Sequence, residues 1–124
     1  MKIEKPRPEV LELFERLVPD RPGVECRIMF GARGAWVNGN MFMGTFEQDL
    51  LIRLPEDDRA ELATVGGEPF APMGRPMREY MLLPQDMHED DHALTTWVER
   101  AFQFVAAMPV KVKKPKKPAA PRNV

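Results

Sequence analysis

Two histidines stand four residues apart in the segment His88-Glu89-Asp90-Asp91-His92, which matches the pattern H-E-x-x-H. On a helix this spacing places two imidazoles one turn apart, where they can bind zinc with the glutamate as general base. A catalytic zinc also needs a third protein ligand, and no histidine follows His92. Acidic residues in the first turn stabilise a helix through its dipole. We therefore favour a solvated helix start over a zinc hydrolase, and we expect no metal or other cofactor.

Cys26 and a glycine-containing segment are the other candidates for chemistry. Cys26 is the sole cysteine, so no intrachain disulfide can form. A nucleophilic cysteine needs a neighbouring base, and both histidines lie far along the chain, so we interpret Cys26 as a small buried hydrophobic residue. Gly31-Ala32-Arg33-Gly34 lacks the Gly-Lys-Ser/Thr of a phosphate-binding loop and is predicted to be a turn. The sequence therefore predicts a protein that is not an enzyme.

Charge is divided unequally along the chain, although the formal net charge is only −1. Residues 111–124 contain six basic residues and no acidic one, and they are Lys111, Lys113, Lys114, Lys116, Lys117 and Arg122. The rest of the chain has 12 basic and 19 acidic residues, a formal charge of −7. Residues 110–124 are predicted to be disordered, because lysine and proline bury little apolar surface. Two interpretations stay open, namely sequence-independent nucleic-acid contact and a solubilising tail.

Three helices are predicted within a single domain of residues 8–109. Apolar residues at helical spacing predict a first helix that opens at Pro8 and a long last helix that closes at Pro109. Asp86 is the predicted cap of the last helix, with Glu89 three residues later as in a capping box. A short middle helix follows Pro55 and ends at Gly66-Gly67, where glycine accepts the left-handed conformation.

Several strands are predicted between these helices. Val24, Cys26, Ile28 and Phe30 recur with a period of two, which is typical of a strand with one buried face. Asn38-Gly39 between two apolar runs is a strong hairpin signal. Further strands are predicted at 50–54 and 78–83. We expect a two-layer α+β domain, in which an antiparallel meander of about four to five strands is packed by the three helices. The methionines fill its core or line a Met/Phe surface for self-association.

The order of several short segments resembles the TfoX N-terminal domain. The residues that carry the resemblance are Arg27, Met29, Phe30, Gly31, Gly34, Met41, Phe42, Arg53, Tyr80 and Trp97. Ala32 departs from the family, which often has a second glycine there. The resemblance spans about residues 10–108, and such domains occur in bacterial competence regulators of the TfoX/Sxy type and in small stand-alone proteins. It implies an antiparallel two-layer fold and a regulatory role, and it assigns no catalytic residues.

We therefore expect function through protein–protein contact, with a homodimer through the sheet or the Met/Phe surface as one form. The identity of a protein partner stays open, as does the nucleic-acid alternative. No run approaches the roughly 20 apolar residues that span a bilayer, and the N-terminus lacks the apolar run of a signal peptide. We expect a cytoplasmic protein without a membrane partner.

Overall fold

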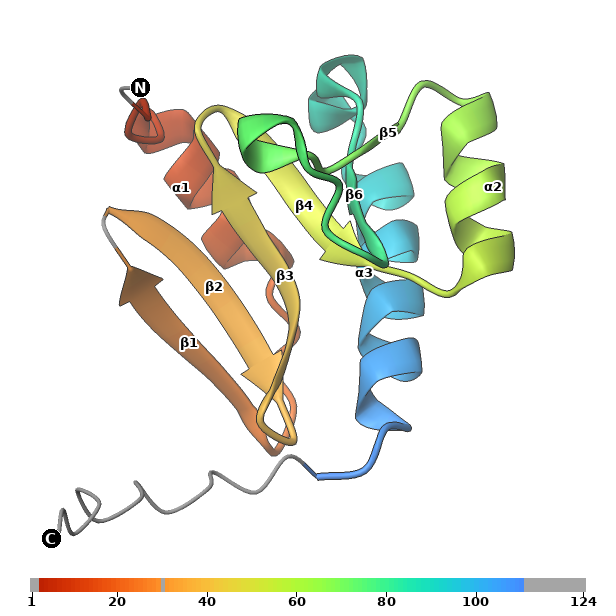
Figure 1. Ribbon diagram of the computed structural model, residues 1–124. Helices are drawn as coiled ribbons and strands as arrows, with labels where there is room; N and C mark the ends of the chain where they lie inside the picture. The colour runs from red at the N-terminus through yellow and green to blue at the C-terminus, as the bar shows by residue number, and fades with distance from the viewer. Residues whose placement is uncertain (1–2, 30, 111–124) are drawn as a thin grey trace, which may run out of the picture.

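The computed structural model describes residues 3–29 and 31–110 (Figure 1). Three α-helices are present in these residues, and they are α1 (Pro8–Leu17), α2 (Glu56–Thr64) and α3 (Asp91–Ala106). The strands are β1 (Val24–Met29), β2 (Ala32–Val37), β3 (Asn40–Phe46), β4 (Asp49–Arg53), β5 (Glu68–Pro69) and β6 (Tyr80–Leu82). Two short 3-10 helices, η1 (Pro72–Gly74) and η2 (Gln85–Glu89), lie in the connections. No described helix is long and apolar enough to cross a bilayer.

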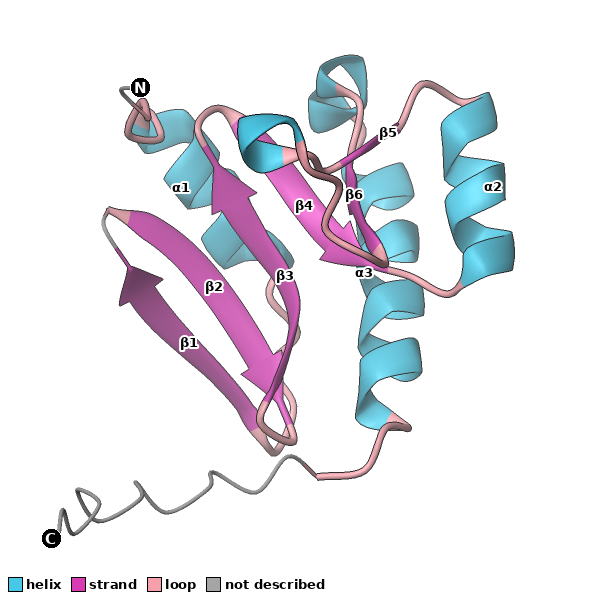
Figure 2. Ribbon diagram, in the orientation of Figure 1, coloured by secondary structure: helices cyan, strands magenta, loops and turns pink. Residues whose placement is uncertain are grey.

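The strands form one antiparallel sheet in the order β1-β2-β3-β4-β6-β5 (Figure 2). The first four are a meander, and the predicted turn at Asn38-Gly39 is confirmed, with φ values of 54° and 79° that suit a tight hairpin. The α+β class with its antiparallel sheet is also confirmed. The sheet has six strands rather than four to five, because Glu68 and Pro69 form an additional short strand that pairs with β6.

The hydrophobic core lies between one face of the sheet and the helices α1 and α3, with Leu62 of α2 joining it. A bulge in β3 adds to this core. Ala35 pairs with Met43 and Trp36 with Met41, so Phe42 has no partner across the β2–β3 ladder. Phe42 and Met43 are consequently both fully buried, although they are neighbours in a strand. The Phe42 ring meets the Phe102 ring of α3 edge to face, with centroids 5.5 Å apart.

The middle helix ends as its glycines predict. The N–H of Gly66 donates to the carbonyl of Ala63, and the N–H of Gly67 donates to the carbonyl of Leu62 at 2.9 Å. Gly66 has a φ of 105°, which glycine adopts without strain. This pair of bonds is a Schellman motif, which satisfies carbonyl groups that the end of a helix would otherwise leave unpaired.

The start of the last helix differs from the prediction. Asp90 caps α3, because its carboxylate accepts a hydrogen bond from the N–H of Ala93 at 3.0 Å. The predicted cap, Asp86 with Glu89, is wrong, since both residues lie in η2. Several acids in this segment suit a cap. Asp90 is the cap because it lies between the end of η2 at Glu89 and the start of α3 at Asp91.

Strand β1 is much less buried than its period-two pattern predicts. The prediction that Cys26 is buried is wrong, and Ile28 is 66% exposed. The reason is tertiary, because β1 lies at the edge of the sheet and α1 packs on β3 and β4. Phe30, which belongs to the same pattern, lies outside the described residues.

Candidate functional site

The two histidines of the H-E-x-x-H segment lie on different elements. His88 belongs to η2, whereas His92 belongs to the first turn of α3 and is exposed. The pattern needs both imidazoles on one helix face, which the break at Asp90 prevents. Among the residues that the structure describes, no three His, Cys, Asp or Glu side chains gather as a metal site would require. The segment serves to start α3, with Asp90 in place of the predicted cap.

His88 is half-buried, and its Nε2 atom has no hydrogen-bond partner among the described residues. Burial lowers the pKa of His88 from its usual 6.5, and the nearby Asp49 carboxylate partly opposes this change. Protonation of His88 is therefore easier in the unfolded chain than in the folded one.

This lowered pKa predicts a pH dependence of stability. Above about pH 6.5 His88 is neutral in both states, and as the pH falls below that value the unfolded state binds the proton first, so the folded state loses stability. We expect His88→Gln to reduce the loss of unfolding free energy between about pH 7.5 and 5.5. Urea unfolding followed by circular dichroism at both pH values measures the effect. His92→Gln, at an exposed site, is the matched control, and an equal reduction in both variants would contradict the prediction.

Cys26 is exposed on β1, and its environment does not activate it. Burial of part of the side chain raises the pKa of the Cys26 thiol, and the charge of Glu15 raises it further. A nucleophilic thiol needs the opposite shift, towards the thiolate. No histidine is among the described residues that line the groove around Cys26.

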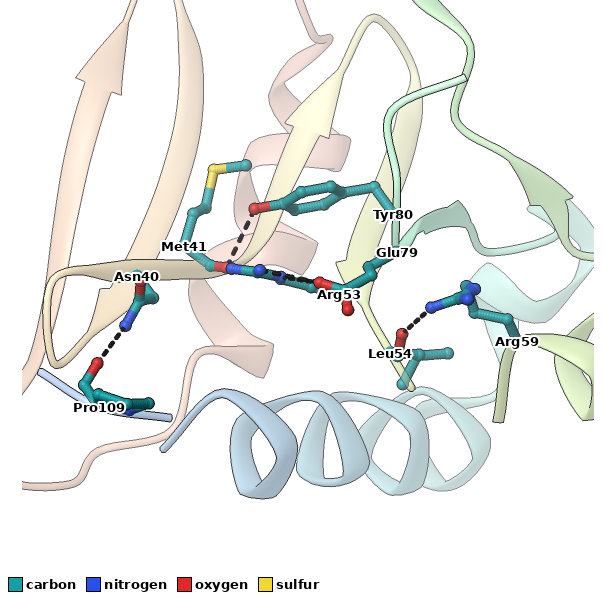
Figure 3. A network of polar contacts seen from close by, with 8 residues as sticks. All are labelled: Asn40, Met41, Arg53, Leu54, Arg59, Glu79, Tyr80 and Pro109. Atoms are coloured by element: carbon teal, nitrogen blue, oxygen red, sulfur yellow. Dashed lines mark hydrogen bonds and ion pairs between the residues drawn. The ribbon is translucent and has the colours of Figure 1, made fainter. Parts of the chain in front are cut away.

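Three of the residues that carry the family resemblance meet on the face of the sheet away from α1 and α3 (Figure 3). Arg53 and Tyr80 are directly paired on β4 and β6. The Tyr80 hydroxyl donates to the carbonyl of Met41 on β3 at 3.3 Å, and the Arg53 guanidinium lies 5.6 Å from the centre of the Tyr80 ring. Burial raises the pKa of Tyr80, against the effect of Arg53, so the phenol stays protonated and can donate.

Glu79 completes this network, although nothing in its local sequence indicates this role. Its Oε1 atom lies 2.8 Å from Nη2 of Arg53 and accepts from Nε at 2.9 Å, which makes a two-pronged ion pair (Figure 3). Both side chains are about three-quarters buried, with 23% and 28% exposed. The N–H of Leu54 donates to the carbonyl of Glu79 at 2.8 Å. The network therefore connects β3, β4 and the start of β6.

Other described residues of the resemblance also have structural roles. Phe42 and Trp97 are buried in the core. Gly31 has a φ of 84°, which favours glycine. A Cβ atom on Gly34 would lie 2.6 Å from the Trp36 ring. The absence of a side chain at Gly34 therefore leaves room for the indole to pack against the backbone of β2. Arg27 in turn places its guanidinium 5.0 Å from the centre of that ring.

A groove lies between α1 and the edge strand β1, and both apolar and charged side chains line it. It has a volume of about 520 Å³, and its walls include Phe14, Val18, Arg21, Val24, Cys26 and Ile28. Charged residues lie on the opposite face of β1, where Glu25 and Arg27 form an exposed ion pair at 3.3 Å. Sequence reasoning missed this site, because alternation reveals the two faces of a strand but not whether a helix covers one of them.

The basic residues proposed for nucleic-acid contact, Lys111 to Arg122, lie outside the described residues, and that hypothesis stays a prediction. In the described residues, three helices pack a six-stranded antiparallel sheet that has an open edge at β1. These features define a small α+β domain. Residues 13–105 match the TfoX N-terminal domain, and the chain belongs to this family. No curated protein matches the chain.

Proposed function

We propose that this chain is a non-enzymatic TfoX N-terminal domain that acts through protein–protein contact at strand β1. The observation that carries the proposal is an edge strand of six residues beside a groove that both apolar and charged side chains line. Ile28 is 66% exposed there, the largest exposed fraction among the large apolar side chains of the described residues. An open strand edge offers unpaired N–H and C=O groups to a partner strand, and the groove offers pockets for its side chains.

The contrast between the two edges of the sheet supports this choice. Proteins commonly blunt a sheet edge with short strands, proline or bulges, because an unpaired strand is a template for association. The far edge, β5, follows this practice with two residues, one of which is Pro69. Strand β1 has neither proline nor an interrupted register with β2. Apart from the charged side chains of Glu25 and Arg27, β1 therefore lacks these protections.

The proposal includes a regulatory role in the cytoplasm. The resemblance to bacterial competence regulators favours regulation through contact with another protein. An exposed free thiol at Cys26 is compatible with a reducing compartment, where such a cysteine persists without a disulfide. The dispersal of the histidines, Cys26 and the carboxylates over separate elements supports the non-enzymatic part of the proposal.

Site-specific photocrosslinking in the native host tests the contact. A photoreactive phenylalanine analogue at position 28 should give one defined adduct on irradiation, because that side chain would face the partner. The same analogue at Val65 is the control, since this residue is also exposed, at 53%, but follows α2 far from β1. The absence of an adduct at position 28, or the same adducts at both positions, would overturn the proposal.

A further inference from the structure

The edge strand β1 has a sequence that complements itself in antiparallel orientation. When two copies are placed with Cys26 opposite Cys26, Glu25 of each copy faces Arg27 of the other, and Val24 of each faces Ile28 of the other. Directly opposed residues of an antiparallel pair point to the same face of a sheet. The two charge pairs would therefore lie on one face and the two apolar pairs on the face that carries the groove.

The observed contacts fit this arrangement. Glu25 and Arg27 now pair with each other at 3.3 Å, with side chains that are 68% and 54% exposed, so both can reach a neighbouring strand. The inner-face residues Val24, Cys26 and Ile28 all line the groove beside α1. A two-fold axis at Cys26 would join the grooves of the two copies and would cover the exposed Ile28 side chains.

Other alignments of the same strand lack this match. If the two-fold axis moves by half a residue, Cys26 of one copy faces Arg27 of the other, and Glu25 faces Ile28. Both charged side chains then lose a charged partner. If the axis passes through Arg27, two guanidinium groups oppose each other, and like charges directly opposite destabilise a strand pair. The register centred on Cys26 is therefore favoured by both charge and apolar pairing.

We propose that the partner of β1 is a second copy of this chain, paired antiparallel about Cys26 so that the two sheets become continuous. This inference rests on the proposed contact function and names its partner. A pairing of five residues, Val24 to Ile28, buries less than a standard interface of about 1,600 Å². The dimer is accordingly weak and concentration-dependent, and it contains two equivalent Glu25–Arg27 contacts.

Charge reversal tests the pairing. In Glu25→Arg, two arginines face each other at both charge contacts, and in Arg27→Glu two glutamates do so. We expect each single reversal to weaken dimerisation about tenfold, and the double variant E25R/R27E to restore it. Sedimentation equilibrium of the full chain at micromolar concentrations measures the mass against 14.2 kDa for one copy. A monomer at all concentrations, or a dimer that none of the reversals weakens, would overturn the self-pairing.

Cysteine crosslinking tests the register independently. Opposed residues in an antiparallel pair have Cα atoms roughly 4.5–5.5 Å apart, inside the range of about 4.4–6.8 Å that a disulfide spans. Diamide, which accepts the two hydrogens that the thiols release, should therefore join the wild-type chain into a Cys26–Cys26 dimer. The variant C26S/V65C, with its one thiol on the far side, should join much more slowly. Equal rates in the two proteins would contradict the pairing.

A mixed pair of variants sharpens the register further. Val24→Cys and Ile28→Cys, each combined with Cys26→Ser, should form disulfides when mixed and not when alone. In a pair formed by two copies of the same variant, the two cysteines lie about 13 Å apart along the strands. This distance is beyond the reach of a disulfide. Crosslinking of either variant alone, in preference to the mixture, would rule out the axis at Cys26.

The experiments separate the two proposals. A monomeric purified chain that still gives an adduct at position 28 in cells, with a mass other than that of a second copy, would overturn self-pairing and leave the contact function standing. The absence of any adduct, together with a monomeric chain, would overturn both. An adduct with the mass of two copies, together with the charge-reversal pattern, would support both.

Discussion

Replacing Phe42 with alanine is expected to lower the free energy of unfolding by about 3–5 kcal/mol, the usual cost of removing a fully buried phenylalanine. The side chain is completely inaccessible to solvent, and its ring meets Phe102 at 5.5 Å. The β3 bulge fixes its direction, so the neighbouring strands cannot readily close the cavity. Urea unfolding followed by circular dichroism gives the value.

Met41→Ala is the matched control for this prediction. Met41 precedes Phe42 in the same hairpin but is half-buried, and its contact with Tyr80 uses a main-chain carbonyl that alanine also has. We expect this variant to cost well under half as much. If the two variants lost the same free energy, Phe42 would not anchor the two layers, and its place in the family resemblance would need a different explanation.

Replacing Glu79 with glutamine is expected to cost about 1.5–3 kcal/mol, the range for a hydrogen bond to a charged group. The change removes the charge that faces Arg53 and leaves a guanidinium that is only 23% exposed without its counter-ion. Glu79 has a φ of 75°. Glutamine has almost the same shape as glutamate and meets the same backbone strain, so the measured loss reports the ion pair.

A double-mutant cycle isolates this interaction. In the Arg53→Met background, Glu79→Gln should cost much less than in the wild type, because the charged partner is already gone. The exposed ion pair on β1 provides a second comparison. Glu25→Gln, at a side chain that is 68% exposed, should change stability by less than about 0.5 kcal/mol, since solvent screens such pairs. Equal losses at Glu79 and Glu25 would contradict the structural role of the Arg53 network.

Phe42, Arg53 and Tyr80 show what residues of the resemblance do in the fold. Phe42 fills the core on one face of the sheet, and Arg53 and Tyr80 form their network with Glu79 on the other face. Each of these side chains is engaged in holding strands or layers together. Strand β1, in contrast, carries several exposed side chains, and contact with a partner is proposed there.

The candidate site contains contacts that could not be predicted from the sequence. Arg53 and Tyr80 could be selected by resemblance, but their pairing depends on β6 lying beside β4, which brings together residues 27 positions apart. Glu79 could not be selected, because nothing in its local sequence indicates a partner on another strand. The start of the last helix shows the same limit, since a helix that began after Asp86 would carry both histidines, whereas the chain changes from η2 to α3 between them.

Elements that have a local cause follow directly from the order of the residues. Turn chemistry determined the hairpin at Asn38-Gly39 and the end of α2 at Gly66-Gly67, and apolar spacing determined the course of α1 and α3. Tertiary structure alone decided which acid caps α3 and whether the apolar face of β1 is covered. Spacing along a chain records which side chains share a face, whereas the burial of that face depends on which distant segment packs against it.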